Sequence, residues 1–89
     1  MNDLPAVPSA QVALETNPLD TVYAARRANL RLLVAQHGNG ALAARLGYTS
    51  GSYITQLLSD ERSFTEVAAR SIEQKLGLMF GWMDMTRAA

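Results

Sequence analysis

The stretch that decides the fold spans residues 41–59 and reads ALAARLGYTSGSYITQLLS. Its first half places Leu42 and Leu46 four residues apart, so both lie on one face of a short helix. Gly47 ends that helix, because glycine takes the left-handed conformation beyond a helix C-terminus at little cost. A second helical pattern follows the turn, with Ile54 on its apolar side. Two short helices across a glycine-containing turn predict a helix-turn-helix.

Length and composition are those of one ordinary globular domain. The 89 residues are 48% hydrophobic and 18% charged, which suffices for one small core. Cysteine is lacking, so disulfides and thiolate metal sites are excluded and a reducing compartment is favoured. No apolar run approaches the ~20 residues of a membrane span, and the N-terminus lacks the pattern of a secretory signal. We therefore expect a cytoplasmic protein with no membrane partner.

The net charge is zero, but the charges are unevenly distributed along the chain. Between Thr21 and Ser59 there is no acidic residue, and all eight acids lie outside this segment. The cations of the segment are Arg26, Arg27, Arg31 and Arg45. The part that contains the helix-turn-helix pattern is therefore basic, as expected of a nucleic-acid-binding surface.

The flanking segments supply further helices. Residues 1–16 contain two prolines and no sustained periodicity, so they are predicted to be a flexible tail. A domain over residues 17–85 follows, and residues 86–89 form a C-terminal tail. The first helix begins with Asn17 as its cap and runs to about His37. Asn39 is placed to cap the next helix.

The C-terminal half predicts two more helical segments. Ser63 and Glu66 form a capping box that starts a helix over residues 64–76, and Gly77 ends it. The apolar residues 78–84 have room for one or two further turns. Strand-like alternation of useful length is missing from the sequence, so the predicted fold is all-α with five helices.

The full pattern resembles the lambda-repressor-like (Cro/CI) helix-turn-helix family. The matching segments are RANL at 27–30, LAxxLG at 42–47, SYITQLLS at 52–59, Arg62, ARxIE at 69–73 and GWMD at 81–84, where x marks a position outside the match. The ending is similar to DNA-binding domains of phage-type repressors that continue into a self-cleaving peptidase domain. The resemblance implies a compact five-helix domain with the helix-turn-helix at its second and third helices. It also implies a transcriptional regulator, either a stand-alone phage or prophage-type repressor or the isolated DNA-binding half of one.

The resemblance assigns residues to DNA contacts, with the third helix in the major groove of a double-stranded operator. Gln56 is the first candidate for base reading, because its amide can both donate to and accept from adenine. The candidate base-reading residues are Ser50, Ser52, Thr55, Gln56 and Ser59. The candidate phosphate contacts are Asn39, Gly40, Arg45, Tyr53 and Arg62. The sequence leaves two interpretations for each of Arg26, Arg27 and Arg31. Each is either a phosphate contact or a solvated surface arginine.

So few cations in one copy indicate that two copies act together on a palindromic operator. The residues predicted for a homodimer contact are Phe80, Trp82, Met83 and Met85. The alternative for these side chains is a lid that closes the chain's own core. A runner-up function follows, in which an all-α protein–protein interaction module, such as an antitoxin-like partner binder, uses this Met- and Trp-rich end.

Sequence features of enzymes are missing. The chain has no nucleophile elbow, paired carboxylate cluster, phosphate-binding glycine loop or metal-ligand spacing. His37 stands alone near a helix end, where a surface position is expected. We therefore expect no enzymatic activity, no cofactor, no metal and no small-molecule substrate.

Overall fold

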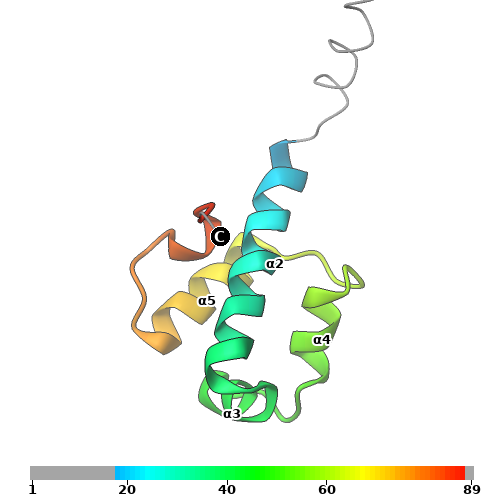
Figure 1. The fold of residues 1–89 in the computed structure, drawn as a ribbon, viewed down its shortest axis with the longest axis vertical. Helices are drawn as coiled ribbons and strands as arrows, with labels where there is room; N and C mark the ends of the chain where they lie inside the picture. Colours follow the sequence, from blue (N-terminus) through cyan, green and yellow to red (C-terminus); the bar gives the residue numbers. More distant parts are fainter. Residues whose placement is uncertain (1–17, 88–89) are drawn as a thin grey trace, which may run out of the picture.

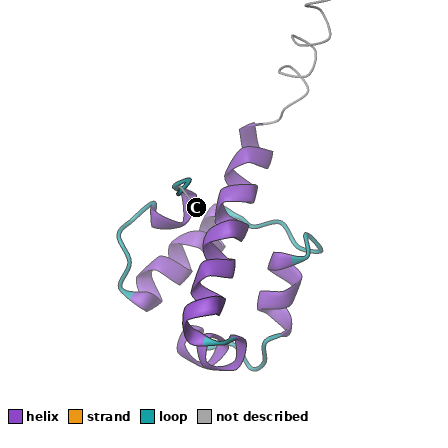
Figure 2. Ribbon diagram, in the orientation of Figure 1, coloured by secondary structure: helices purple, strands orange, loops and turns teal. Residues whose placement is uncertain are grey.

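The computed structural model describes residues 18–87. This part of the chain contains four α-helices, one short 3-10 helix and no strand (Figure 1, Figure 2). The elements are, in chain order, α2 (Pro18–His37), α3 (Asn39–Leu46), α4 (Ser52–Leu58), α5 (Glu66–Leu76) and η1 (Trp82–Asp84). The all-α prediction is confirmed. Within the described residues the apolar segment 78–84 contributes the single turn η1, so the predicted count of five helices is not confirmed. The predicted Asn17 cap and the tail 1–16 lie outside the described residues.

Helix α2 is the central element of the described fold. It contacts α3, α4 and η1, while α5 contacts α3 and η1. In Figure 1, α4 lies on one side of α2, and α5 with the C-terminal end lies on the other. Side chains from every element meet in one apolar core. The largest that are fully buried are Leu30, Leu42, Leu46, Ile54, Leu57, Phe64, Ile72 and Met83.

Glycines end two of the helices as predicted. Gly47 has φ 79° and its N–H bonds back to the carbonyls of Ala43 and Ala44 at the end of α3. Gly77 has φ 71° and closes α5 in the same left-handed conformation. A side chain at either position would be strained, because L-residues avoid positive φ.

Two predicted caps are wrong. The cap of α3 is Gly38, and Asn39 is already inside the helix, without a side-chain capping bond. The cap of α5 is Thr65, whose Oγ1 accepts from the Ala68 N–H at 3.2 Å, so α5 begins at Glu66 and Ser63 lies in the preceding loop. The reason is that Phe64, directly before the cap, is fully buried. Its place in the core fixes the direction in which the chain enters α5, as a hydrophobic staple does.

Arg26 joins three parts of the chain from inside the fold. Its Nε and Nη2 donate to the two carboxylate oxygens of Asp84 at 2.6 and 3.1 Å, and its Nη1 donates to the carbonyl of Phe64 at 2.7 Å. Arg26 is 6% exposed, so both sequence-based alternatives for it, a surface arginine and a phosphate contact, are wrong. A buried guanidinium needs such partners, because an unpaired charge away from water is costly.

Glu73 holds the C-terminal turn from the opposite side. Although 2% exposed, it accepts from the Gly81 N–H at 3.0 Å and from the Met83 N–H at 2.8 Å. Arg70 balances its charge through a 3.1 Å hydrogen bond from Nη2, and Arg70 Nε lies 2.9 Å from Glu73 Oε1 without hydrogen-bond alignment. Arg70 Nη2 also donates to Asp84 at 2.8 Å. Paired charges on α2 and α5 therefore fasten η1 in place.

None of the helices in residues 18–87 has both the length and the apolar character that crossing a bilayer requires.

The Asp84 pair predicts how stability responds to acid. The hydrogen bond from Arg26, helped by that from Arg70, lowers the pKa of Asp84 below its ordinary value of 3.8, although partial burial acts in the opposite direction. A carboxylate with a lowered pKa in the folded state contributes fully above its unfolded pKa and loses that contribution as the pH falls through the folded pKa. We expect Asp84→Asn to lower the free energy of unfolding by about 2 kcal/mol near neutral pH. Below about pH 4 the variant should lose less stability on acidification than the wild type does.

Urea unfolding followed by circular dichroism at pH 7 and at pH 3 measures both effects. Glu61→Gln is the matched control, because Glu61 is exposed in the loop after α4. If Asp84→Asn and the control lose the same stability on acidification, the ion pair is not a source of the pH dependence.

Candidate nucleic-acid interface

The surface predicted to meet DNA is formed by α3, α4 and the turn between them. α4 buries Ile54 and Leu57 completely. On its other side Ser52, Thr55 and Ser59 are exposed. Gln56 is half-buried, so its amide remains within reach of solvent. The division between an apolar inner side and a polar outer side therefore follows the predicted helical period.

Most hydroxyl groups of this surface are already engaged locally. Thr55 Oγ1 donates to the Gly51 carbonyl at 3.1 Å, and Ser59 Oγ donates to the Gln56 carbonyl at 3.3 Å. Ser50 Oγ accepts from the Ser52 N–H at 3.2 Å. A hydroxyl has a single proton to donate, so Thr55 and Ser59 offer outward only lone pairs while these bonds last.

Gln56 has a partner that the sequence did not predict. Arg62, in the loop after α4, donates from Nε at 3.0 Å and from Nη2 at 2.7 Å to the amide oxygen of Gln56. The same guanidinium lies over the Tyr53 ring, 4.8 Å from its centre. Arg62 was predicted as a phosphate contact, and the structure places it beside the foremost base-reading candidate. Gln56 and Arg62 are separated only by the end of α4 and the loop after it. No periodic pattern in the sequence predicts their contact.

Tyr53, beneath this arginine, packs in turn against Tyr48. The rings of Tyr48 and Tyr53 meet edge to face, with centres 4.8 Å apart. The Lys75 ammonium lies over Tyr48, 5.7 Å from its ring centre, and donates to the Leu46 carbonyl at 2.7 Å. Burial, with a smaller effect of Tyr53, raises the pKa of Tyr48 above 10.0, so the phenol stays neutral at physiological pH. The pair gives Arg62 a rigid aromatic support.

The predicted phosphate contacts at α3 differ in their environment. Gly40 and Arg45 are exposed, and Arg45 forms no ion pair with another residue of 18–87. Asn39 Oδ1 is instead buried, with no hydrogen-bond partner among the described residues. A Cβ added to Gly51 would stand 2.5 Å from that oxygen. The Asn39 side chain therefore fills the space between the first turns of α3 and α4. The phosphate contact predicted here is through the backbone amides near Asn39 to Ala41, and the position of the side chain does not test it.

The distribution of positive charge is sparser than the sequence indicated. Arg26 is buried, and Arg27 pairs with Asp60 at 3.2 Å. Arg31 is exposed on α2. The exposed cations on or beside α3 and α4 are then Arg45, Arg62 and Lys75, and Lys75 is already bonded to the Leu46 carbonyl. The field of a single copy is therefore weak.

The C-terminal end presents part of the predicted dimer contact. Phe80 is 76% exposed and Met85 is 52% exposed, and Trp82 is half-buried. Met83 is fully buried in the core. Its assignment to a dimer contact is wrong, because the lid alternative holds for this side chain. Phe80 stacks against Arg70, whose guanidinium lies 4.6 Å from the ring centre.

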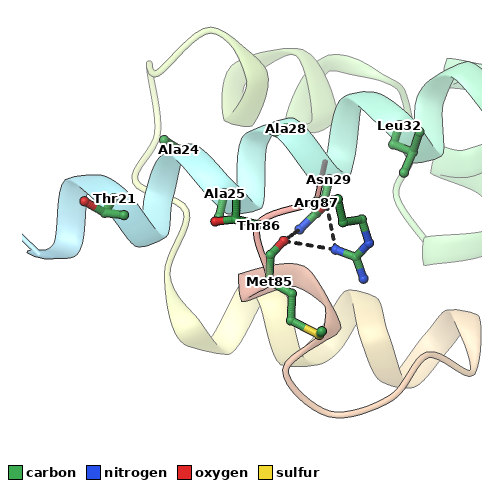
Figure 3. A pocket seen from close by; sticks show the side chains of 9 residues that line it. All are labelled: Thr21, Ala24, Ala25, Ala28, Asn29, Leu32, Met85, Thr86 and Arg87. Atoms are coloured by element: carbon green, nitrogen blue, oxygen red, sulfur yellow. Dashed lines mark hydrogen bonds between the residues drawn. The ribbon is translucent and has the colours of Figure 1, made fainter. Parts of the chain in front are cut away.

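A shallow groove of about 390 Å³ lies between α2 and the chain's end (Figure 3). Arg87 lines it beside Asn29, donating to Asn29 Oδ1 at 2.8 Å and to the Met85 carbonyl at 3.1 Å (Figure 3). Its guanidinium lies over Trp82, 3.7 Å from the ring centre. Ordered contacts thus extend past residue 85, the predicted domain end. The lining is mostly small and apolar, with residues Thr21, Ala24, Ala25, Ala28, Asn29, Leu32, Met85, Thr86 and Arg87. The described residues hold no cluster of three metal-binding side chains.

Comparison of the chain with protein-family models, with curated proteins and with solved structures gave no match.

The contact of Asn39 with Gly51 predicts a strong coupling between the starts of the two helices. Gly51→Ala should destabilise the protein by about 1 kcal/mol, because the added methyl overpacks the site. Asn39→Ala should change stability little, because it removes a buried oxygen that lacks a partner. In the double variant the cost of the Gly51→Ala change should largely disappear. Urea unfolding of all four forms gives the coupling, and strictly additive effects would contradict this contact.

Proposed function

We propose that this chain is a sequence-specific DNA-binding transcriptional regulator, with a lambda-repressor-like helix-turn-helix formed by α3 and α4. The observation that carries the proposal is the arrangement of α4, whose inner residues Ile54 and Leu57 are fully buried. The polar side chains of its outer side remain open to solvent. None of these outer polar groups serves the core, so they are placed to meet an external partner.

In the proposed mechanism, α4 enters the major groove, the only groove of B-DNA that admits a helix and distinguishes all four base pairs. Arg45, with the first amides of α3, holds the phosphate backbone and fixes the register of α4. Binding then blocks or recruits RNA polymerase at the operator. The resemblance to phage-type repressors favours repression.

Two copies are needed for useful affinity. Each neutralised phosphate contributes through counterion release, and the exposed cations near α4 are few. We propose that Phe80 and Met85, with the half-buried Trp82, meet the same residues of a second copy. A two-fold pair would place its α4 helices about 34 Å apart on a palindrome, one turn of DNA.

A second candidate is a protein–protein interaction module. Met79 and Phe80 are 72% and 76% exposed, and exposed neighbouring apolar side chains of this kind mark interaction surfaces. In this candidate the C-terminal end binds another protein and the surface of α4 is an ordinary solvated helix face.

Salt dependence separates the two candidates. Titration of a random duplex at two salt concentrations should show steep weakening for a DNA-binding protein. Arg45→Ala should weaken random and selected duplexes alike and lower the salt slope by about 0.9. Gln56→Ala should weaken the binding free energy for a duplex selected from a random pool by about 1–3 kcal/mol. It should change the binding of a random duplex little.

Gln36→Ala serves as the matched control, because Gln36 is exposed on α2. The proposed function fails if duplex binding is absent at low salt. The assignment of the DNA-binding face fails if Arg45→Ala and Gln56→Ala both leave the affinity for the selected duplex unchanged.

The proposed dimer predicts a difference between whole and half operators. The protein should bind a palindrome more tightly than a single half-site, and Phe80→Ala should reduce that advantage about tenfold, a typical effect of losing an interface aromatic. Binding to the single half-site should stay the same. Val67→Ala is the control, since Val67 is 79% exposed on α5. An unchanged palindrome advantage for Phe80→Ala would place the dimer contact elsewhere.

A further inference from the structure

The amide of Gln56 is not free to read DNA in both directions. Its oxygen accepts two hydrogen bonds from Arg62, at 3.0 and 2.7 Å. An amide oxygen has two lone pairs. The hydrogen bonds from Arg62 Nε and Nη2 therefore occupy both of them. What Gln56 can still offer outward is its NH₂ group, which only donates.

Arg62 is itself only a donor, because a guanidinium has no acceptor. The N–H groups that do not bind Gln56 remain available on an exposed side chain. The Tyr53 ring under the guanidinium restricts its position. Gln56 and Arg62 together therefore form a donor-only group on the outer side of α4, and we call it the Gln56–Arg62 pair.

A donor-only group discriminates between the bases of the major groove. Glutamine reads adenine by donating to N7 while accepting from the N6 amino group. With the amide oxygen occupied, an adenine N6 amino group would face donors and lose its partner. Guanine presents two adjacent acceptors, N7 and O6, whereas thymine presents one acceptor beside a methyl group. Guanine is the base whose edge this pair satisfies.

We propose that Arg62 sets the base preference of Gln56, so that the Gln56–Arg62 pair reads guanine in the major groove where glutamine alone would read adenine. The inference rests on the proposed DNA binding and adds to it a specificity residue outside α4. A contact of Arg62 with phosphate alone would leave the base preference unaffected.

The test is to select duplexes from a random pool with the wild type, with Arg62→Ala and with Arg31→Ala. The wild type should enrich a G·C pair at one position of each half-site. Arg62→Ala frees the amide oxygen, so at that position alone the preference should move to A·T, by about tenfold or more, as for one bidentate base contact. Arg31→Ala removes an equal charge from an exposed position on α2. It should leave the preferred base unchanged.

Guanine analogues sharpen the result. Replacing the guanine by 7-deazaguanine removes the N7 acceptor, so wild-type affinity should fall about tenfold. The fall should be smaller for Arg62→Ala, which keeps only the NH₂ donor of Gln56 at this position. Circular dichroism of each variant confirms that it is folded.

Each outcome separates the two proposals. If no form enriches any duplex, the proposed function itself fails. If the wild type enriches a site but Arg62→Ala retains the same base at every position, or only binds more weakly throughout, the inference about guanine is overturned and the regulator stands. A wild-type preference for A·T opposite Gln56 overturns it as well.

Discussion

Helices α3 and α4 have eight and seven residues, and isolated helices below about 12–15 residues are marginal in water. They persist because Leu42, Leu46 and Ile54 are fully buried in the core that α2 organises. The same burial fixes which side of α4 faces solvent, because side chains of a helix cannot change sides without turning the apolar ones outward. The surface proposed to read DNA is thus a consequence of apolar packing behind it, and its geometry is only as secure as that packing.

The C-terminal end is fastened by a different kind of force. η1 has three residues, too few to bury much apolar surface apart from Met83. Charges from three elements hold it instead, with Arg26 bound to Asp84 and with Glu73 accepting from backbone amides. Buried charges stabilise a fold only when every partner is present, so this corner is specific in geometry and sensitive to the loss of any one member. It also leaves Phe80 at the surface, where it forms part of the proposed dimer contact.

The polar surface of α4 is less open than its residue types imply. The hydroxyl groups of Thr55 and Ser59 donate to backbone carbonyls. The amide oxygen of Gln56 accepts from Arg62. In the proposed DNA complex, base preference would depend on the hydrogen-bonding capacities that remain after the folded protein has used some of them. With few exposed cations, electrostatic attraction in that complex would contribute less than in strongly basic proteins. The proposed binding would rely more on base contacts and on two copies acting together.

The sequence by itself determined the helical class, the long α2, the helix ends at Gly47 and Gly77, and the inner and outer sides of α4. All of these follow from local rules, since helical period and the left-handed preference of glycine act within a few residues. Only the tertiary structure decided that Arg26 is buried, that Met83 belongs to the core and that Thr65 rather than Ser63 caps α5. It alone brought Arg62 to Gln56. These features depend on which groups distant in the sequence come within hydrogen-bond distance or shield one another from water. The spacing of residues along the chain does not predict such contacts.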